Sequence, residues 1–255
     1  MYIYRKILIP LLSVFFILFV TSCATAPPKV IEPTIENIYL LPQAPLIRQN
    51  IYHEVAPGET LWRLSKMYDI SIEEIMRANN LPSSTLEKGQ SLIIPNAAPL
   101  RPIISLYPSN KWRYIIIHHS ATDIGSSYSI DGLHKERGFE RGVGYHFIID
   151  NGTRGKGDGQ IEATPRWIKQ QDGAHCKAGG MNHKGIGICL VGDISKEDVS
   201  ERQMDSLVHL TRELKRYYKI PLSNIIGHGQ VYGASTECPG TRFPWYEFKR
   251  KLSAE

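Results

Sequence analysis

The chain has 255 residues, of which 42% are hydrophobic, 22% charged and 9% aromatic. This composition is that of a globular protein with room for one medium-sized domain and a smaller module. The formal net charge of +5 falls to +3 when Arg5 and Lys6 are set aside, since each carries one positive charge. Such a mild excess of positive charge suits binding to an anionic polymer. The sequence has no arginine-rich stripe, and this absence argues against a nucleic-acid partner.

The first residues predict export. Arg5 and Lys6 precede an apolar run, Ile7–Val20, and small residues follow it, which is the pattern of a secretory signal peptide over residues 1–22. The alternative is an uncleaved membrane anchor, but the run is shorter than the roughly 20 residues that a spanning helix needs. The stretch VTSC resembles the lipobox of bacterial lipoproteins, which implies lipidation of Cys23.

A lipid on Cys23 would hold the mature protein on a membrane of the cell envelope. Ala24 stands where an aspartate would retain a lipoprotein in the inner membrane. For a source with two membranes, this favours the outer membrane, facing the periplasm.

Two segments without periodicity divide the rest of the chain. Residues 23–50 are rich in Pro, Ile and Glu and predict an extended tether, whereas the Pro-rich residues 97–110 predict a linker. Between them, residues 51–96 hold strand-like runs at both ends and two helical patterns. Ser71 lies three residues before Glu74, a spacing that predicts a capping box at the start of the second helix.

The motifs V-x-x-G-E-T-L-W-x-L-S, I-M-x-A-N-N-L and L-x-x-G-Q-x-L-x-I-P resemble the LysM family throughout this module. The resemblance implies a small βααβ module that binds glycans containing N-acetylglucosamine. Its groove lies between the first strand–helix loop and the second helix–strand loop. For Gly58 and Asn80, closing a turn is an equally good explanation. The candidate glycan-binding residues are Gly58, Glu59, Thr60, Asn80 and Leu81.

Residues 111–255 alternate strand and helix signals. The β-rich runs WRYIIIHH, GYHFIID and GIGICLVG are almost continuously apolar, which predicts central strands buried on both faces. Helical patterns cover 129–139 and 200–219, the latter with a capping box from Ser200 to Gln203 and an apolar stripe. The fold class predicted is α/β, a mixed β-sheet flanked by helices.

Potential metal ligands lie at the ends of the strand-like runs or just beyond them. They are one histidine of the pair His118 and His119, then His228 in IIGHGQ, and Cys238 in STECPG. Two imidazoles and a thiolate suit zinc and leave a fourth position for water. Strand alternation lets only one histidine of the pair face a site, but both faces of this strand are apolar, so parity does not choose between them. A core or surface histidine and a Cys–Pro turn remain the simpler alternatives.

From Tyr114 onward, IIIHHSAT, HKERGFERGVGYHFIID, GAHCKAGGMNHKGIGICLVG, GHGQVYGASTECPG and FPWYEFKRKL closely resemble the type 2 N-acetylmuramoyl-L-alanine amidases. This family includes phage endolysins and the peptidoglycan recognition proteins. The resemblance implies a zinc hydrolase that cuts the amide between N-acetylmuramic acid and L-alanine. It implies His118, His228 and Cys238 as ligands and Tyr145 as a catalytic residue. Thr236 falls where members of the family carry Lys or Thr. The resemblance implies that its hydroxyl is a second hydrogen-bond donor to the reacting amide.

Other residues of these motifs receive smaller roles. His175 matches a histidine that lines the substrate groove, and Asn182 is a second groove candidate, with a turn-forming role as its alternative. His119 is expected to pack or to support a ligand, and His146 and His134 are expected to be structural. With Cys23 assigned to a lipid, the three remaining cysteines are an odd number for an exported protein. The two that are not ligands are left free or paired: Cys176 and Cys189.

The sequence thus predicts a monomeric, lipid-anchored zinc amidase that LysM holds on peptidoglycan. The main alternative is a peptidoglycan sensor that binds without cutting, since recognition-protein relatives without the ligand cysteine do so. Cys238 is present here, which favours the enzyme. A recycling amidase is disfavoured because those relatives usually carry an aspartate as the third ligand and need no LysM module.

Overall fold

The computed structural model describes residues 47–254. The predicted signal peptide, the predicted lipidation site Cys23 and most of the predicted tether lie outside these residues. Among residues 47–254, no helix combines the length and the hydrophobicity needed to cross a membrane.

The module expected over residues 51–96 folds as strand, helix, helix, strand, as predicted. Strands β1 (Gln49–Glu54) and β2 (Ser91–Ala97) pair antiparallel, and helices α1 (Leu61–Tyr68) and α2 (Ile72–Ala78) connect them. The capping box is present, because the Ser71 hydroxyl accepts from Glu74 N and the Glu74 carboxylate accepts from Ser71 N. Both helices pack their apolar sides on the two strands in one small core.

The larger region contains a five-stranded sheet in the order β5-β4-β6-β3-β7. Only β4 and β5 pair antiparallel, so the sheet is mixed, as predicted. The three central strands are almost entirely buried, in agreement with their continuous apolarity. The strands are β3 (Tyr114–His119), β4 (Phe147–Asn151), β5 (Asp158–Ala163), β6 (Gly185–Leu190) and β7 (Ile225–Gly227).

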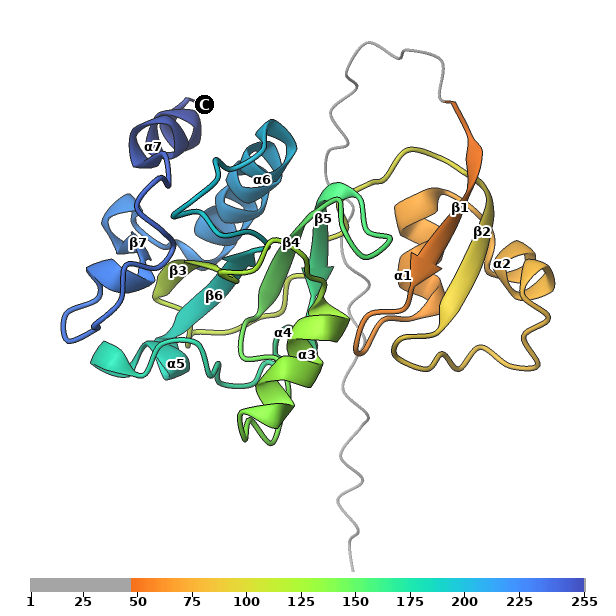
Figure 1. The fold of residues 1–255 in the computed structure, drawn as a ribbon, viewed down its shortest axis with the longest axis horizontal. Coiled ribbons are helices and arrows are strands. Elements are labelled where there is room, and N and C mark those ends of the chain that lie inside the picture. The colour runs from red at the N-terminus through yellow and green to blue at the C-terminus, as the bar shows by residue number, and fades with distance from the viewer. Residues whose placement is uncertain (1–46, 255) are drawn as a thin grey trace, which may run out of the picture. The chain divides into compact units, whose positions relative to one another are not determined.

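Helices cover both faces of this sheet. Figure 1 shows α6 and α7 on one side, and α3 and α5 on the other. On the α6 side, alternate strand residues such as Ile115, Ile117 and Phe147 form the main core with Leu207 and Phe248. On the other side, Ile116 and Ile148 lie in two smaller clusters. The helices are α3 (Ser127–Glu136), α4 (Pro165–Ile168), α5 (Met181–Lys184), α6 (Glu201–Tyr218) and α7 (Trp245–Ser253).

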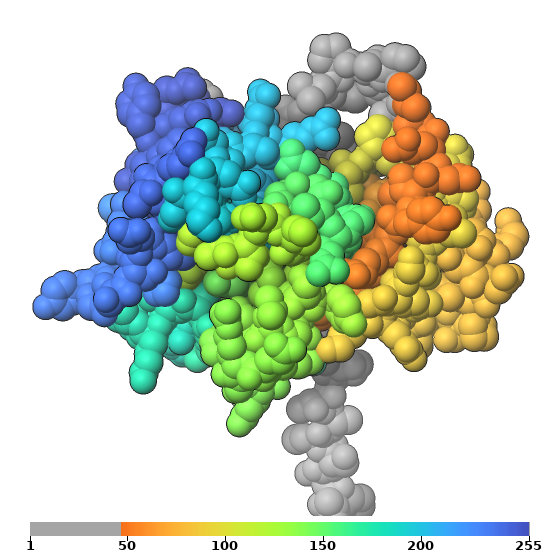
Figure 2. All heavy atoms as spheres, viewed as in Figure 1, coloured from red at the N-terminus to blue at the C-terminus, as the bar shows by residue number. Residues whose placement is uncertain are grey.

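The face of the sheet opposite α6 carries the two smaller clusters. In the all-atom view, the yellow-green residues that follow β3 and the green residues of α3 lie on the same face of the molecule (Figure 2). Strand β3 alternates its side chains, so His118 shares the face of Ile116, while His119 shares the face of Ile117. The burial pattern therefore separates the two histidines that the sequence could not.

Candidate active site

The sheet register brings the first two candidate ligands together. Strands β3 and β7 are parallel neighbours with Ile117 opposite Gly227. The residues that follow these two, His118 and His228, therefore lie at the same edge of the sheet. Their ring centroids are 4.8 Å apart. His118 is buried, whereas His228 is partly exposed. A parallel pairing thus places two imidazoles side by side although they are 110 positions apart in the sequence.

Cys238 reaches the same point from the loop that follows β7. Its backbone oxygen accepts from Gly229 N at 2.7 Å, and its Sγ lies 3.5 Å from His118 Nδ1. One ligand atom from each of His118, His228 and Cys238 falls within 4.8 Å of the others. This is the only such group of three or more His, Cys, Asp or Glu side chains within residues 47–254.

The protonation of these groups follows from burial. Burial, together with the nearby His175 and His228, lowers the pKa of His118 well below its usual value, and burial also lowers the pKa of His228. Both imidazoles are therefore neutral at pH 7 and carry a free lone pair. Burial raises the pKa of the Cys238 thiol to about 11, although a backbone hydrogen bond from His119 opposes this shift. A bound cation would favour the thiolate, because a coordinated thiol loses its proton.

The donor set fits zinc. Nitrogen and sulfur donors are the usual ligands of Zn²⁺, and three protein ligands leave one position open. A copper site of the blue type would need a nearby axial methionine, and no methionine follows Cys238 in the sequence.

Tyr145 stands beside the candidate ligands. It is partly exposed, and its ring centroid lies 5.1 Å from that of His118. Burial raises the pKa of its phenol well above the usual value, and the nearby thiols of Cys189 and Cys238 add to the rise. The phenol therefore keeps its proton at pH 7 and can donate a hydrogen bond.

Two histidines that the sequence assigned to structure hold the segment around Tyr145. Gly144 N donates to His134 Nδ1 at 2.9 Å, and Gly187 N donates to His146 Nδ1 at 2.9 Å. His146 is fully buried, and its Nε2 donates to the backbone oxygen of Gln171. These bonds fix the backbone on both sides of Tyr145.

Thr236 lies exposed on the loop between His228 and Cys238, and its hydroxyl oxygen accepts from Cys238 N at 3.2 Å. Its O–H remains available as a donor. His119 does not face the ligand group, because its Nδ1 accepts from Ile194 N at 3.1 Å. Cys176 and Cys189 are both free and buried.

His175 and Asn182 make contacts that the sequence did not suggest. His175 is 8% exposed and lies against His118, with His118 Nε2 3.0 Å from His175 Nδ1. The Asn182 side-chain oxygen accepts from the backbone nitrogens of His175 and Cys176 at 2.8 and 2.7 Å. No periodicity signals such contacts, since they join a loop to a strand end and to the short helix α5.

The five LysM candidates differ in what they can offer a glycan. Gly58, Thr60 and Asn80 are exposed, whereas Leu81 is half-buried and packs on the module's core. Glu59 is buried, where its carboxylate lies 2.7 Å from His53 Nε2 and accepts from Ala56 N at 2.9 Å. Thr60 also caps α1 by accepting from Arg63 N.

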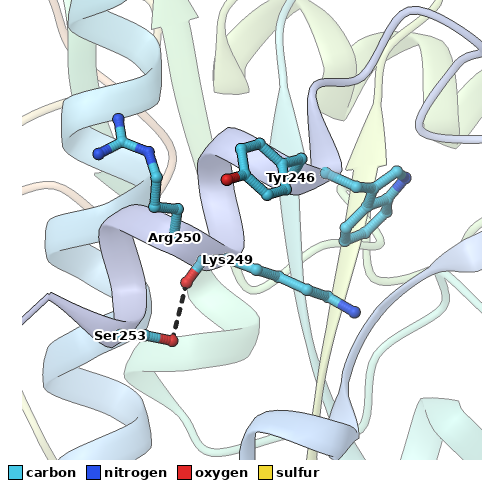
Figure 3. Close-up of a pocket in the computed structure, with 5 residues that line it drawn as sticks. Tyr246, Lys249, Arg250 and Ser253 are labelled. Carbon is cyan, nitrogen blue, oxygen red and sulfur yellow. Dashed lines mark hydrogen bonds between the residues drawn. The ribbon is translucent and has the colours of Figure 1, made fainter.

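A surface hollow of about 500 Å³ lies along α7, and Figure 3 shows the side chains that line it. None of the candidate catalytic residues lines it. Its lining residues are Trp245, Tyr246, Lys249, Arg250 and Ser253.

Comparison with known proteins assigns both regions of the chain. Residues 53–95 match the LysM domain. Over 144 residues the chain is 33% identical to the endolysin of Escherichia phage T7, covering 53% of this chain and 82% of that protein. It is 38% identical over 79 residues to the "Probable endopeptidase p60" of Listeria monocytogenes, a match that covers 31% of this chain but only 15% of the Listeria protein.

Among solved structures, the N-acetylmuramoyl-L-alanine amidase LysC from Clostridium intestinale URNW is 34% identical, with a TM-score of 0.48. The match covers 58% of this chain and 90% of that one. The sequence profile of the N-acetylmuramoyl-L-alanine amidases matches residues 108–241, more than half of the chain. The protein belongs to the N-acetylmuramoyl-L-alanine amidase family.

Proposed function

We propose that the protein is a zinc-dependent N-acetylmuramoyl-L-alanine amidase that hydrolyses the amide between N-acetylmuramic acid and the L-alanine of the stem peptide. The observation that carries this proposal is the ligand group: one donor atom each of His118, His228 and Cys238 lies within 4.8 Å of the others, beside Tyr145. A zinc ion held there would supply Lewis-acid polarisation of the amide carbonyl and acidify a water molecule.

The chain's own residues would stabilise the charge that develops on the amide oxygen. Tyr145 retains its proton and lies next to His118, so its O–H can orient water or donate to that oxygen. Thr236 O–H can donate from the loop that carries Cys238. A threonine donor is neutral, so it gives less electrostatic stabilisation than a lysine at the same position would.

The LysM module would hold the enzyme on glycan strands. We propose that contact is made through the exposed loop residues Gly58, Thr60 and Asn80. The buried Glu59 would act indirectly, because its carboxylate is already bonded to His53 and to Ala56 N. Leu81 would contribute by packing.

We further propose that Cys23 carries the lipid and that the enzyme acts as a monomer in the cell envelope, on the periplasmic side of an outer membrane. The signal-like N-terminus and Ala24 support this proposal. Labelling with a radioactive fatty acid tests it: wild type should incorporate label and Cys23→Ala should not.

The test of the activity is digestion of purified peptidoglycan followed by mass spectrometry of the released stem peptides. Wild type with zinc should release free stem peptides, and Cys238→Ser should not. Cys176→Ser is the matched control, because Cys176 is a buried thiol outside the ligand group, and it should release peptides as wild type does. Release by Cys238→Ser at the wild-type rate would contradict the proposal.

The same assay addresses a sensor that binds without cutting, the alternative suggested by the recognition-protein members of the family. A sensor would sediment with peptidoglycan and release nothing. The intact ligand group, with Cys238 in place, favours the enzyme.

A further inference from the structure

His175 lies behind a metal ligand rather than in the open groove. Its imidazole is buried, and both of its ring nitrogens have partners. Nε2 lies 3.1 Å from the backbone oxygen of Gly185, and Nδ1 lies 3.0 Å from His118 Nε2. A ring with both nitrogens occupied by the protein has no polar atom left for a substrate.

We propose that His175 is a positioning residue that fixes the tautomer of His118, so that His118 binds the metal through Nδ1. The proposal rests on the zinc site of the proposed function and deepens it. It assigns to His175 a role toward the ligand, in place of a contact with the substrate.

The hydrogen-bond directions determine the tautomer step by step. The carbonyl of Gly185 can only accept, so His175 Nε2 must carry the hydrogen. In the neutral ring, His175 Nδ1 is then a bare acceptor, and the hydrogen between the two rings must belong to His118 Nε2. His118 Nδ1 is left with a free lone pair, and this is the nitrogen that lies 3.5 Å from Cys238 Sγ.

The surroundings hold the His175 ring in this orientation. Asn182 fixes its backbone by accepting from His175 N and Cys176 N. Two glycines leave space for the ring: a Cβ at Gly187 would lie 2.6 Å from His175 Cδ2, and a Cβ at Gly173 would lie 2.2 Å from the same atom. Non-bonded atoms do not approach this closely, so any larger residue at either glycine would displace the ring. The two glycines and Asn182 therefore hold the His175 ring in one position.

This arrangement matches the general way in which proteins orient metal-bound histidines. A ligating imidazole donates its other N–H to a partner, which fixes the tautomer, and loss of that partner lowers metal affinity about 10- to 100-fold. Here the partner is a second imidazole, itself oriented by a backbone carbonyl.

Two amide substitutions separate the hydrogen bond from simple packing. In His175→Asn, the side-chain oxygen can occupy the position of Nδ1 and still accept from His118, while the bond to Gly185 is lost. In His175→Gln, the amide reaches the position of Nε2 and can keep the Gly185 bond, but the acceptor next to His118 is lost. Gln is closer in size to His, so a packing role would favour Gln over Asn.

The experiment measures zinc affinity of the full-length variants by competition with a chromophoric chelator. His175→Asn should bind zinc within about 10-fold of wild type, and His175→Gln should bind it about 10- to 100-fold more weakly. Equal affinities, or a weaker Asn variant, would overturn the proposal. If wild type itself binds no zinc, the proposed zinc site fails instead, so the two failures are distinguishable.

A second measurement keeps the inference testable if the variants fold poorly. Long-range ¹⁵N–¹H NMR spectra of metal-free wild type report the tautomer of each imidazole. His118 and His175 should both be protonated on Nε2 and bare on Nδ1. A proton on Nδ1 of either ring would refute the proposed tautomers.

Discussion

The pair His118 and His119 allows a sharp test, because adjacent residues of one type have opposite roles. His118→Ala removes one of three protein ligands from the candidate zinc site. His119→Ala removes only the acceptor of the Ile194 backbone N–H. The backbone N–H of His119, which interacts with the Cys238 sulfur, survives the substitution to alanine.

The structure sets different magnitudes for the two losses. Structural zinc sites bind with about 10–16 kcal/mol, so one of four coordination positions accounts for roughly 3–4 kcal/mol, and zinc affinity should fall about 100- to 1,000-fold in His118→Ala. In His119→Ala, the amide of the buried Ile194 loses its partner. This costs about 1–3 kcal/mol of stability and leaves zinc affinity unchanged.

Chelator competition gives the zinc affinity, and urea unfolding of the metal-free proteins gives the stability. Peptidoglycan digestion should be abolished in His118→Ala and largely preserved in His119→Ala. Equal losses of zinc affinity in the two variants would refute the assignment of faces on β3. Full zinc binding by His118→Ala would refute the ligand set itself.

Three further outcomes are expected. Removing zinc with 1,10-phenanthroline should lower the Tm of wild type and leave that of Cys238→Ser unchanged; an unchanged wild-type Tm would speak against a metal in the folded state. Burial alone would raise the pKa of Glu59, but the coulombic attraction of His53 and their hydrogen bond bring it down to about 2 from 4.5. The stabilisation is therefore fully present above about pH 4.5 and disappears as the pH falls toward 2. Urea unfolding between pH 2 and pH 5 should show Glu59→Gln on the order of 3 kcal/mol less stable than wild type at pH 5, and a pH-independent difference would contradict the pairing. Ser200→Ala removes the cap of α6 and should cost about 1 kcal/mol in the same measurement, with zinc affinity as the control that should not change.

The sequence predicts elements well where burial and periodicity coincide. Strands β3 and β6 are buried on both faces and read as apolar runs. Helix α6 has its predicted cap at Ser200 and buries its stripe of leucines. In each case the local pattern and the tertiary environment favour the same residue types, so the sequence alone is sufficient to predict the element.

Strand β5 escaped prediction because its buried residues include polar ones. Its sequence DGQIEA contains Glu162, which is 2% exposed. The carboxylate is tolerated there because Lys156 Nζ lies 3.1 Å away and Ser127 donates from both its backbone and its hydroxyl. These partners come from other segments, so no pattern within the strand reveals its burial. Helices α4 and α5 have only four residues each, too few for a periodicity.

The candidate site shows the same division at the level of single residues. The sequence places His118 and His228 at strand ends, and the parallel register of β3 and β7 makes them neighbours. Cys238 reaches them through a loop, so the sequence offers it as a ligand by residue type alone, and its proximity to the two histidines is a property of the fold. The resemblance aligns residues with family positions but does not supply hydrogen-bond directions. For His175 these directions decide the role, because they determine which nitrogen of His118 is left without a hydrogen. A mutation at His175 should therefore change the metal affinity first, and the rate of amide hydrolysis only through it. A substrate-contacting residue would instead raise KM at saturating zinc, and this difference separates the two roles on one purified variant.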